Sequence, residues 1–574
     1  MISDNGSILG PKGTGKKRIL VIGVDGATFD LIRPWMEEGK LPTFAKLVKS
    51  GVSGELTTVF PPVSPVAWTS FLTGKNPGKH GVMDFMVREE GSYQRVYANY
   101  IDSKILPVIL SESNQKVGML YVPFGLYPLR KVNGFIIPGV FSPQGAPTHP
   151  LSLKEELKKE IDDYEITMGL AGFCVPTMEN DWLRKITGTT EKVTEVTLYL
   201  MRKYSWDFFM TTFYYIDLVQ HYFWKYMDPQ HPAYNAEEAK TYGNVILEYY
   251  QKIDGIIDII LKEVDKRTTV IIISDHGHGP LHKHVLINNW LRKIGFLKLR
   301  KRPKTRSLKQ FLGRQLTRKE ITDMLFKSNL SKILLKIITY GFLRRGYTRL
   351  LDYSRPTLSD VDWRRTKAYS VGFVGQIFLN LIGREPAGII EPGEEYEKLR
   401  NHLIKKLYAL KDPENDEKIV DEVFKKEEVY RGPYTNQAAD LFFTMKGLTY
   451  ITHMSTEFGA DANTLTEPPH NFQSSHHRMN GVLIVTGPHI KKGIIIKNAK
   501  IIDIAPTILH IMNVPIPSDM DGRVLKEIFD SKSDLAEREV KYVKPSKKKA
   551  EMKRVSKEEE EEIKERLKVL GYLG

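Results

Sequence analysis

Arg18-Ile-Leu-Val-Ile-Gly-Val24 is an almost unbroken apolar run, and it ends at Asp25-Gly26. A short apolar run bounded by a turn signal predicts a buried strand. A helical pattern follows over residues 29–38, so the segment as a whole predicts a strand, a loop and a helix. The carboxylate of Asp25 then lies in the loop at the carboxyl end of the strand.

The same strand-then-loop pattern recurs further along the chain, at residues 206–214, 269–274 and 482–486. Amphipathic helical stretches such as residues 239–264 lie between these runs. Strands alternating with helices predict an α/β sheet covered on both faces. Ligands of open α/β sheets collect at the carboxyl ends of the strands. Asp25, Asp217 and Asp275 all fall there.

Composition and pattern divide the chain into segments. These are a flexible tail over residues 1–17, a catalytic α/β domain over 18–290 and 365–530 with a smaller α+β layer at 385–460, a basic and largely helical insertion over 291–364, and a charged tail over 531–574.

The positive charge of the chain is concentrated in the insertion. Residues 291–350 hold 18 Lys and Arg against two acidic residues, a surplus of 16, whereas the whole chain has a formal net charge of +15. The segment is either a solvated surface or a peripheral contact with an anionic membrane surface. Nucleic acid is disfavoured as a partner because no binding motif is present. The oligomeric state is left open.

The remaining composition is that of a folded protein. Of its 574 residues, 41% are hydrophobic, 27% are charged and one is cysteine, Cys174. A single cysteine excludes an intramolecular disulfide and fits a reducing compartment. No apolar run approaches the length of a signal-peptide core or of a membrane span. We therefore expect a cytoplasmic location, with peripheral membrane contact as the alternative.

Five short segments carry the candidate chemistry. They are Val24-Asp25-Gly26, Pro62-Val63-Ser64-Pro65, Asp217-Leu-Val-Gln-His221, Ser274-Asp275-His276-Gly277 and Ser475-His476-His477-Arg478. Together they supply three aspartates, at least three histidines and one hydroxyl. This mixture suits zinc and its neighbours better than magnesium or calcium. Six protein ligands are too many for one catalytic zinc and divide into two sites.

These segments, in this order, resemble the alkaline phosphatase superfamily, and in particular the type I phosphodiesterase/nucleotide pyrophosphatase family. Ser274-Asp275-His276-Gly277 and the Asp217-to-His221 spacing are the most specific parts of the resemblance. Apart from the basic insertion, it extends from about Arg18 to Phe529. It implies an alkaline-phosphatase-like three-layer α/β/α sandwich and a hydrolase that cleaves phosphodiester or pyrophosphate bonds of a small phosphate-ester substrate.

The resemblance also implies two sets of metal ligands. The first ligand set is Asp217, His221 and His477, with His476 as the alternative to His477. The second ligand set is Asp25, Asp275, His276 and the hydroxyl of Ser64. Two divalent ions are expected, zinc first and manganese or another divalent ion as the alternative. Ser64 is the expected nucleophile, forming a phospho-serine intermediate, because coordination to a dication lowers the pKa of its hydroxyl.

The chain departs from the family beside the nucleophile. Nucleotide-cleaving members resemble Thr-Phe-Pro-Asn there, and the asparagine donates a hydrogen bond to the bound phosphate. This chain has Ala67 at that place, which cannot donate from its side chain. Lys75, His80 and Arg478 are candidate substrate contacts, chosen for their chemistry and place in the sequence.

Three alternatives to a phosphodiesterase stay open. One is a phosphomonoesterase on the same scaffold. Another is a different phospho- or sulfo-ester hydrolase or transferase, although the sulfatase motif is absent around Ser64. From another class, the chain would be an inactive metal-binding or ligand-binding protein that keeps the fold.

Overall fold

A computed structural model of the chain describes residues 17–89, 92–93, 95–97, 101, 103–143, 145–164, 179–300, 356–452, 458–459, 461, 463–469, 473–545 and 555–569. Most of the expected tail at residues 1–17 and most of the basic insertion lie outside this part. The described ends of the insertion carry α11 (Ile287–Lys293) and two short 3-10 helices, Leu358–Asp360 and Trp363–Arg365.

The centre of the fold is a sheet of nine strands among the described residues. Eight of them follow the order β19 (Ile494–Ile495), β2 (Val52–Thr57), β18 (Asn480–Thr486), β8 (Thr268–Ile273), β1 (Arg18–Val24), β7 (Phe208–Phe213), β5 (Val117–Leu120) and β6 (Gly134–Ile137). The ninth, β20 (Ala499–Lys500), pairs with β2. Strand β1 is parallel to both β7 and β8, whereas β18 is antiparallel to β8 and β2.

The four strands expected from the sequence are all present in this sheet. Strand β1 begins and ends as predicted, and β7, β8 and β18 differ from their predicted bounds by one or two residues. Residues 19–22 of β1 are fully buried because helices cover both faces of the sheet.

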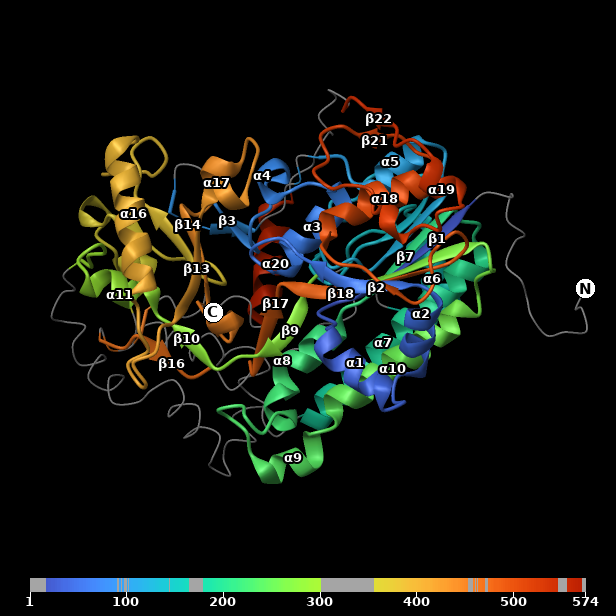
Figure 1. Ribbon diagram of the computed structural model, residues 1–574, viewed down its shortest axis with the longest axis horizontal. Helices are drawn as coiled ribbons and strands as arrows, with labels where there is room; N and C mark the ends of the chain where they lie inside the picture. The colour runs from blue at the N-terminus through green and yellow to red at the C-terminus, as the bar shows by residue number, and fades with distance from the viewer. Residues whose placement is uncertain are drawn as a thin grey trace, which may run out of the picture.

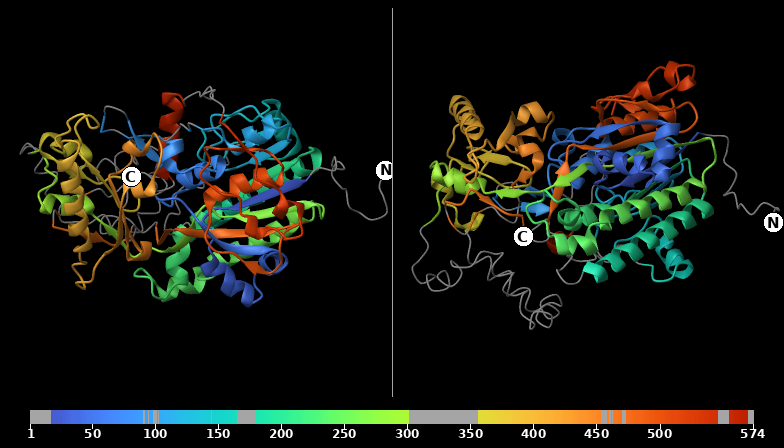
Figure 2. Two further views of the ribbon diagram at one scale, coloured as in Figure 1. Left: turned by 45° about the horizontal axis from the view of Figure 1, so that its top comes forward. Right: turned by 60° about the horizontal axis from the view of Figure 1, so that its bottom comes forward.

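Helices form the two outer layers (Figures 1 and 2). One layer contains α1 (Phe29–Glu37), α2 (Pro42–Ser50), α7 (Glu179–Lys203), α8 (Tyr215–Met227), α9 (Ala236–Tyr242) and α10 (Val245–Leu261). The opposite layer contains α3 (Ser64–Thr73), α5 (Leu106–Glu112), α18 (Ile504–Ile511) and α19 (Asp534–Glu537). The expected three-layer α/β/α sandwich is therefore confirmed.

One predicted helix differs from its counterpart in the structure. Residues 239–264 are not continuous, because α9 ends before Gly243 and α10 begins at Val245. Glycine is a poor helix former, and the backbone N–H of Gly243 closes α9 by donating to the carbonyl of Ala239. Elsewhere, α4 (Pro77–His80) and α6 (Ser152–Glu160) are short helices of the same domain.

A second, smaller lobe lies beside the sandwich (Figure 1). Its sheet has the order β11 (Ala368–Tyr369), β12 (Gln376–Leu379), β14 (Leu441–Met445) and β13 (Val420–Lys425), and its helices are α16 (Glu394–Tyr408) and α17 (Lys426–Val429). A three-stranded sheet of β15 (Tyr450–Ile451), β10 (Lys283–Val285) and β16 (Thr466–Glu467) adjoins it. Two of the lobe's strands thus precede residue 385, where the smaller layer was expected to begin.

The charged C-terminal segment takes part in the fold. Strand β22 (Tyr542–Val543) pairs with β21 (Ile516–Pro517), and α20 (Lys557–Val569) packs beside a hairpin of β3 (Met86–Arg88) and β4 (Arg95–Tyr97). Ile563 and Leu567 of α20 are fully buried, since their i, i+4 spacing places both on one face of the helix. None of the helices in the described part of the chain combines the length and apolar character that a transmembrane span requires.

Candidate metal centre

Three aspartates meet where neighbouring parallel strands end. Strands β8, β1 and β7 lie side by side, so the residues that follow them are brought to one edge of the sheet. Asp25 follows β1, Asp275 follows β8, and Asp217 lies in the first turn of α8, directly after β7. All three side chains are fully buried.

A short two-stranded ladder brings the histidines to the same place. Strand β9 (Gly277–Pro280) follows His276, and it pairs antiparallel with β17 (Ser475–Arg478). The register sets His477 opposite His278. Histidines from two distant parts of the sequence therefore contribute to one cluster.

The first ligand set, Asp217, His221 and His477, is compact. His221 Nε2 lies 3.4 Å from Asp217 Oδ2 and 3.1 Å from His477 Nε2, and His477 Nε2 lies 3.5 Å from Asp217 Oδ1. His221 Nδ1 donates to the carbonyl of Ser475 at 2.8 Å, and His477 Nδ1 donates to the carbonyl of Pro62 at 2.7 Å. Each ring then presents the lone pair of Nε2 to the cluster, as metal-bound histidines do.

The second ligand set lies around Ser64, the first residue of α3. Ser64 Oγ is 3.3 Å from His276 Nε2, which is 3.2 Å from Asp275 Oδ2 and 3.9 Å from Asp25 Oδ1. His276 Nδ1 lies 3.1 Å from the carbonyl of Gly277 and donates to it, so its Nε2 also faces inward as an acceptor. Trp68, one turn along α3, donates its indole N–H to Asp25 Oδ2 at 2.9 Å and orients that carboxylate.

The electrostatics of the cluster favour a bound cation. Burial and the neighbouring carboxylates of Asp275 and Asp217 raise the pKa of Asp25 well above its usual range. Burial and Asp217 likewise raise the pKa of Asp275 to about 8. Burial lowers the pKa of His276, and nearby His477 lowers it further, so this imidazole is neutral. Carboxylates crowded among neutral imidazoles lack compensating positive charge.

The polar atoms that face the centre fit a divalent ion. Asp25 Oδ1 and Asp275 Oδ2 are buried and accept no hydrogen bond from the described residues. Buried acceptors normally have partners, and cations complete such sites. The groups able to hold an ion within one small sphere are Asp217 with His221 and His477, Asp25 with Asp275 and His276, and Asp217 with His276 and His278.

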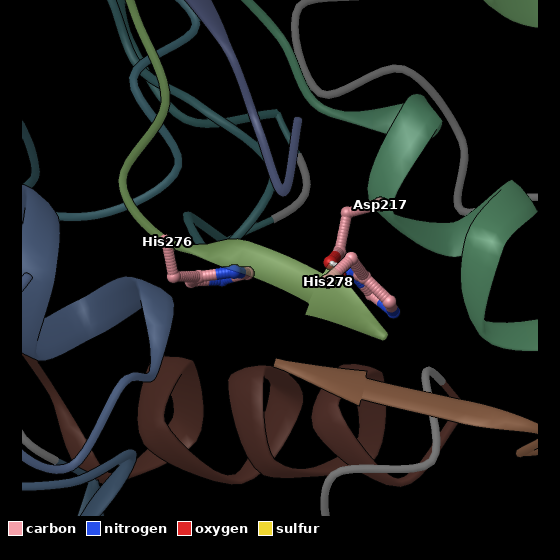
Figure 3. A group of neighbouring side chains, drawn as sticks. All are labelled: Asp217, His276 and His278. Carbon is pink, nitrogen blue, oxygen red and sulfur yellow. Dashed lines mark ion pairs between the residues drawn. The ribbon is translucent and has the colours of Figure 1, made fainter. Parts of the chain in front are cut away.

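His278 also belongs to this cluster, although it is not among the ligands expected from the sequence. Figure 3 shows its side chain meeting that of Asp217, with His276 directly before the strand that carries His278. His278 Nδ1 lies 3.2 Å from Asp217 Oδ1, and burial together with neighbouring His221 lowers the pKa of His278 to about 3. Its position two residues after His276 was the available signal, because alternate residues of a strand share one face.

Gly26 sets the distance between the loop after β1 and helix α8. Its φ is +67°, which favours glycine. A Cβ at this position would lie 2.7 Å from Asp217 Oδ1 and 3.1 Å from His278 Nδ1. A larger residue would therefore push the loop that carries Asp25 away from helix α8, which carries Asp217.

The three candidate substrate contacts are held by other parts of the fold. Lys75 pairs with Asp519 at 2.5 Å, and His80 Nε2 lies 2.9 Å from Ser70 Oγ. The Arg478 guanidinium donates to backbone carbonyls, including that of Pro280. Lys75 and His80 are committed to partners outside the Asp/His cluster, whereas Arg478 lies next to His477 in β17 and donates to its backbone carbonyl at 3.1 Å.

The family model for type I phosphodiesterase/nucleotide pyrophosphatase matches residues 19–471. No curated protein matches the chain.

The solved structures to which the chain is similar include the following two. Human ectonucleotide pyrophosphatase/phosphodiesterase 5 is 12% identical, with a TM-score of 0.47 over 90% of this chain and 100% of that one. Phosphonoacetate hydrolase from Sinorhizobium meliloti is 12% identical, with a TM-score of 0.49 over 87% of this chain and 96% of that one.

Proposed function

This chain belongs to the type I phosphodiesterase/nucleotide pyrophosphatase family, and we propose that it hydrolyses a phosphodiester or pyrophosphate bond at a two-metal centre with Ser64 as its nucleophile. As a member of this family it is a metal-dependent phosphoric ester hydrolase. The number and identity of the metal ions, the roles of the individual residues and the covalent intermediate are our proposal.

One observation carries this proposal. The two ligand sets adjoin each other, and the hydroxyl of Ser64 lies at their edge, 3.3 Å from His276 Nε2. Three carboxylates and three inward-facing imidazole nitrogens exceed what one catalytic zinc takes from a protein. Two ions would divide them into two ordinary sites.

The spacing of the first ligand set supports zinc. Ligand atoms around a tetrahedral zinc lie about 3.3 Å apart, given metal–ligand distances of about 2.0–2.1 Å. Nε2 of His221 lies 3.1 Å from Nε2 of His477, and these two nitrogens lie 3.4 and 3.5 Å from Oδ2 and Oδ1 of Asp217, respectively. Imidazole and carboxylate donors also suit zinc.

We assign to Ser64 the attack on phosphorus. Its oxygen forms a bond to phosphorus as the bond to the leaving oxygen breaks, and the departing alcohol takes up the proton that the serine loses. Water then cleaves the phosphoserine, which releases the phosphate product and restores the hydroxyl. Bound divalent ions would supply the charge that lowers the pKa of the serine hydroxyl and stabilises the leaving oxygen.

Helix α3 contributes to this step. Ser64 is the first residue of the helix, so the positive end of the helix dipole faces the reacting phosphate. Ala67 is fully buried inside the helix and offers no side-chain donor. The non-bridging phosphate oxygens would therefore depend on the helix terminus and the bound ions.

The test is the cleavage of bis-p-nitrophenyl phosphate by protein of known metal content, before and after treatment with a chelator. We expect cleavage that the chelator abolishes and Zn²⁺ restores. Parallel assays with p-nitrophenyl phosphate, nucleotides and dinucleotides distinguish a diesterase from a monoesterase. Failure to cleave any of these esters in a chelator-sensitive way would refute the proposal.

A further inference from the structure

Gln220 lies in α8 between Asp217 and His221 and is fully buried. Its side chain links helix α8 to the loop after β1. The side-chain amide donates from Nε2 to the carbonyl of Gly26 at 2.9 Å, and its Oε1 accepts from the hydroxyl of Tyr250 at 3.1 Å. Both ends of the amide are therefore engaged.

Tyr250, a fully buried residue of α10, extends this link back to the same loop. The backbone N–H of Thr28 donates to the Tyr250 hydroxyl at 3.2 Å. The loop is thus held at Gly26 and again at Thr28, and Asp25 precedes the first of these points. A buried hydrogen-bond network of this kind makes a loop rigid.

The loop needs such a restraint because it carries one of three crowded carboxylates. Asp25, Asp217 and Asp275 are fully buried in one cluster, where like charges repel one another. Repulsion would separate the loop from α8. The amide of Gln220 is a neutral group that joins the two without adding charge.

The first ligand set has other supports. The hydroxyl of Ser475 donates to the backbone carbonyl of Gln220 at 2.7 Å, and the backbone N–H of Ser474 donates to the carbonyl of His221 at 2.7 Å. These bonds join α8 to β17, which carries His477. They involve no side-chain atom of Gln220, so a change of that side chain leaves them in place.

We propose that Gln220 is a positioning residue that holds the second ligand set at a fixed distance from the first. The inference rests on the proposed two-metal function. It assigns the two sets separate supports: the Ser474 and Ser475 contacts hold the first set together, whereas the Gln220–Tyr250 link holds the Asp25 loop against it.

Gln220→Met tests this assignment, because methionine has a similar length and no amide. Apoprotein is titrated with Zn²⁺ alone, in competition with a chromogenic chelator. For the wild type we expect two binding phases. For Gln220→Met we expect one unchanged phase and one weakened about 10- to 100-fold, the range for groups that orient metal ligands.

Steady-state kinetics provide a second measurement, and a general loss of stability would not reproduce its expected result. At limiting Zn²⁺ the kcat/KM of Gln220→Met should fall by a similar factor, and excess Zn²⁺ should restore most of it. Tyr250→Phe, which removes only the hydroxyl, should shift the same binding phase by a smaller factor. It also provides a test if the Gln220 variant folds poorly.

Asn288→Leu is the matched control. Asn288 is another buried amide with both ends engaged, since it donates to the carbonyl of Ser370 at 2.8 Å and accepts from the Ser370 N–H at 2.7 Å. Loss of this amide should lower the thermal midpoint of unfolding and leave both phases of Zn²⁺ binding unchanged. If Gln220→Met leaves both phases intact, or weakens both equally, the inference is wrong.

The inference and the proposed function fail in different ways. A wild type that binds two Zn²⁺ ions and cleaves no phosphate ester refutes the proposed function alone. The binding titration contains no substrate and still decides the role of Gln220. A wild type that binds fewer than two ions refutes both.

Discussion

Two buried clusters of charge in this molecule differ in how their carboxylates are balanced. In the smaller lobe, Asp440 receives two bonds from the Arg384 guanidinium, at 2.7 and 2.6 Å, and one from the hydroxyl of Tyr396 at 2.6 Å. Lys426 lies 3.3 Å away. At the edge of the large sheet, Asp25 and Asp275 have no comparable cation among the described residues.

The pKa values reflect this difference. Burial alone would raise the pKa of Asp440, but Arg384 and Lys426 lower it to about 2. The pKa of Asp275 is instead raised to about 8 by burial and by Asp217. The chain completes the first cluster itself, whereas the second needs charge from outside. We therefore assign stability to the first and catalysis to the second.

The largest expected effect is that of Ser64→Ala. Loss of the nucleophile should reduce ester cleavage by about 10³-fold or more, as in other enzymes that lose a nucleophilic serine. Bound metal and the thermal midpoint should change little, because the Asp and His ligands remain. Ser70→Ala in the same helix is the control and should keep most of the activity. Full activity of Ser64→Ala would exclude the proposed nucleophile.

Arg384→Met should have the next largest effect, which is a loss of stability. It leaves Asp440 as a buried charge without its main partner, which costs about 3–5 kcal/mol of unfolding free energy. Urea unfolding measures this loss. The double variant Arg384→Met/Asp440→Asn should recover part of it, because the unpaired charge is gone. A loss below about 1 kcal/mol in the single variant would contradict the structural role of this cluster.

Acid should weaken the same cluster. The pKa of Asp440 is about 2 in the folded chain and about 3.9 in an unfolded one, so its stabilising contribution is complete above pH 4. As pH falls toward 2 the contribution disappears, a loss of about 2 kcal/mol. Urea unfolding at a series of pH values should show this slope, and Asp440→Asn should have a shallower one.

Asp275→Asn should show the smallest effect of these variants, and without metal it should raise the unfolding free energy instead of lowering it. The pKa of Asp275 is raised to about 8, so at neutral pH this carboxyl must take up a proton when the metal-free chain folds, which costs stability. An amide needs no proton, so the metal-free variant should be more stable than the wild type. With Zn²⁺ added the order should reverse, because a ligand is missing. Unfolding curves with Zn²⁺ and with chelator test both halves of this prediction.

The sequence predicted the parts of the fold that have a strong local pattern. Strand β1 is apolar at nearly every position, and its end at Asp25-Gly26 is marked by glycine. The same reasoning located β7, β8 and β18. The long helix at 239–264 was only partly right, because a turn at Gly243 and Asn244 divides it.

The parts that depend on pairing between distant segments were harder to foresee. Strand β17 has the sequence Ser475-His-His-Arg478, which carries no alternation of apolar and polar residues. It forms a strand because β9 pairs with it, and this pairing draws His278 into the cluster. Likewise, nothing near Gln220 in the sequence points to Tyr250 or to the carbonyl of Gly26.

The position of β18 has a consequence for the synthesis of this protein. Residues 480–486 lie between β8 and β2 in the sheet, yet they are translated long after both. While the ribosome is still adding residues before 480, the edges of β8 and β2 that β18 later covers have no partner, and exposed strand edges promote aggregation. A nascent or prematurely terminated chain would therefore depend on chaperones until this late strand closes the sheet.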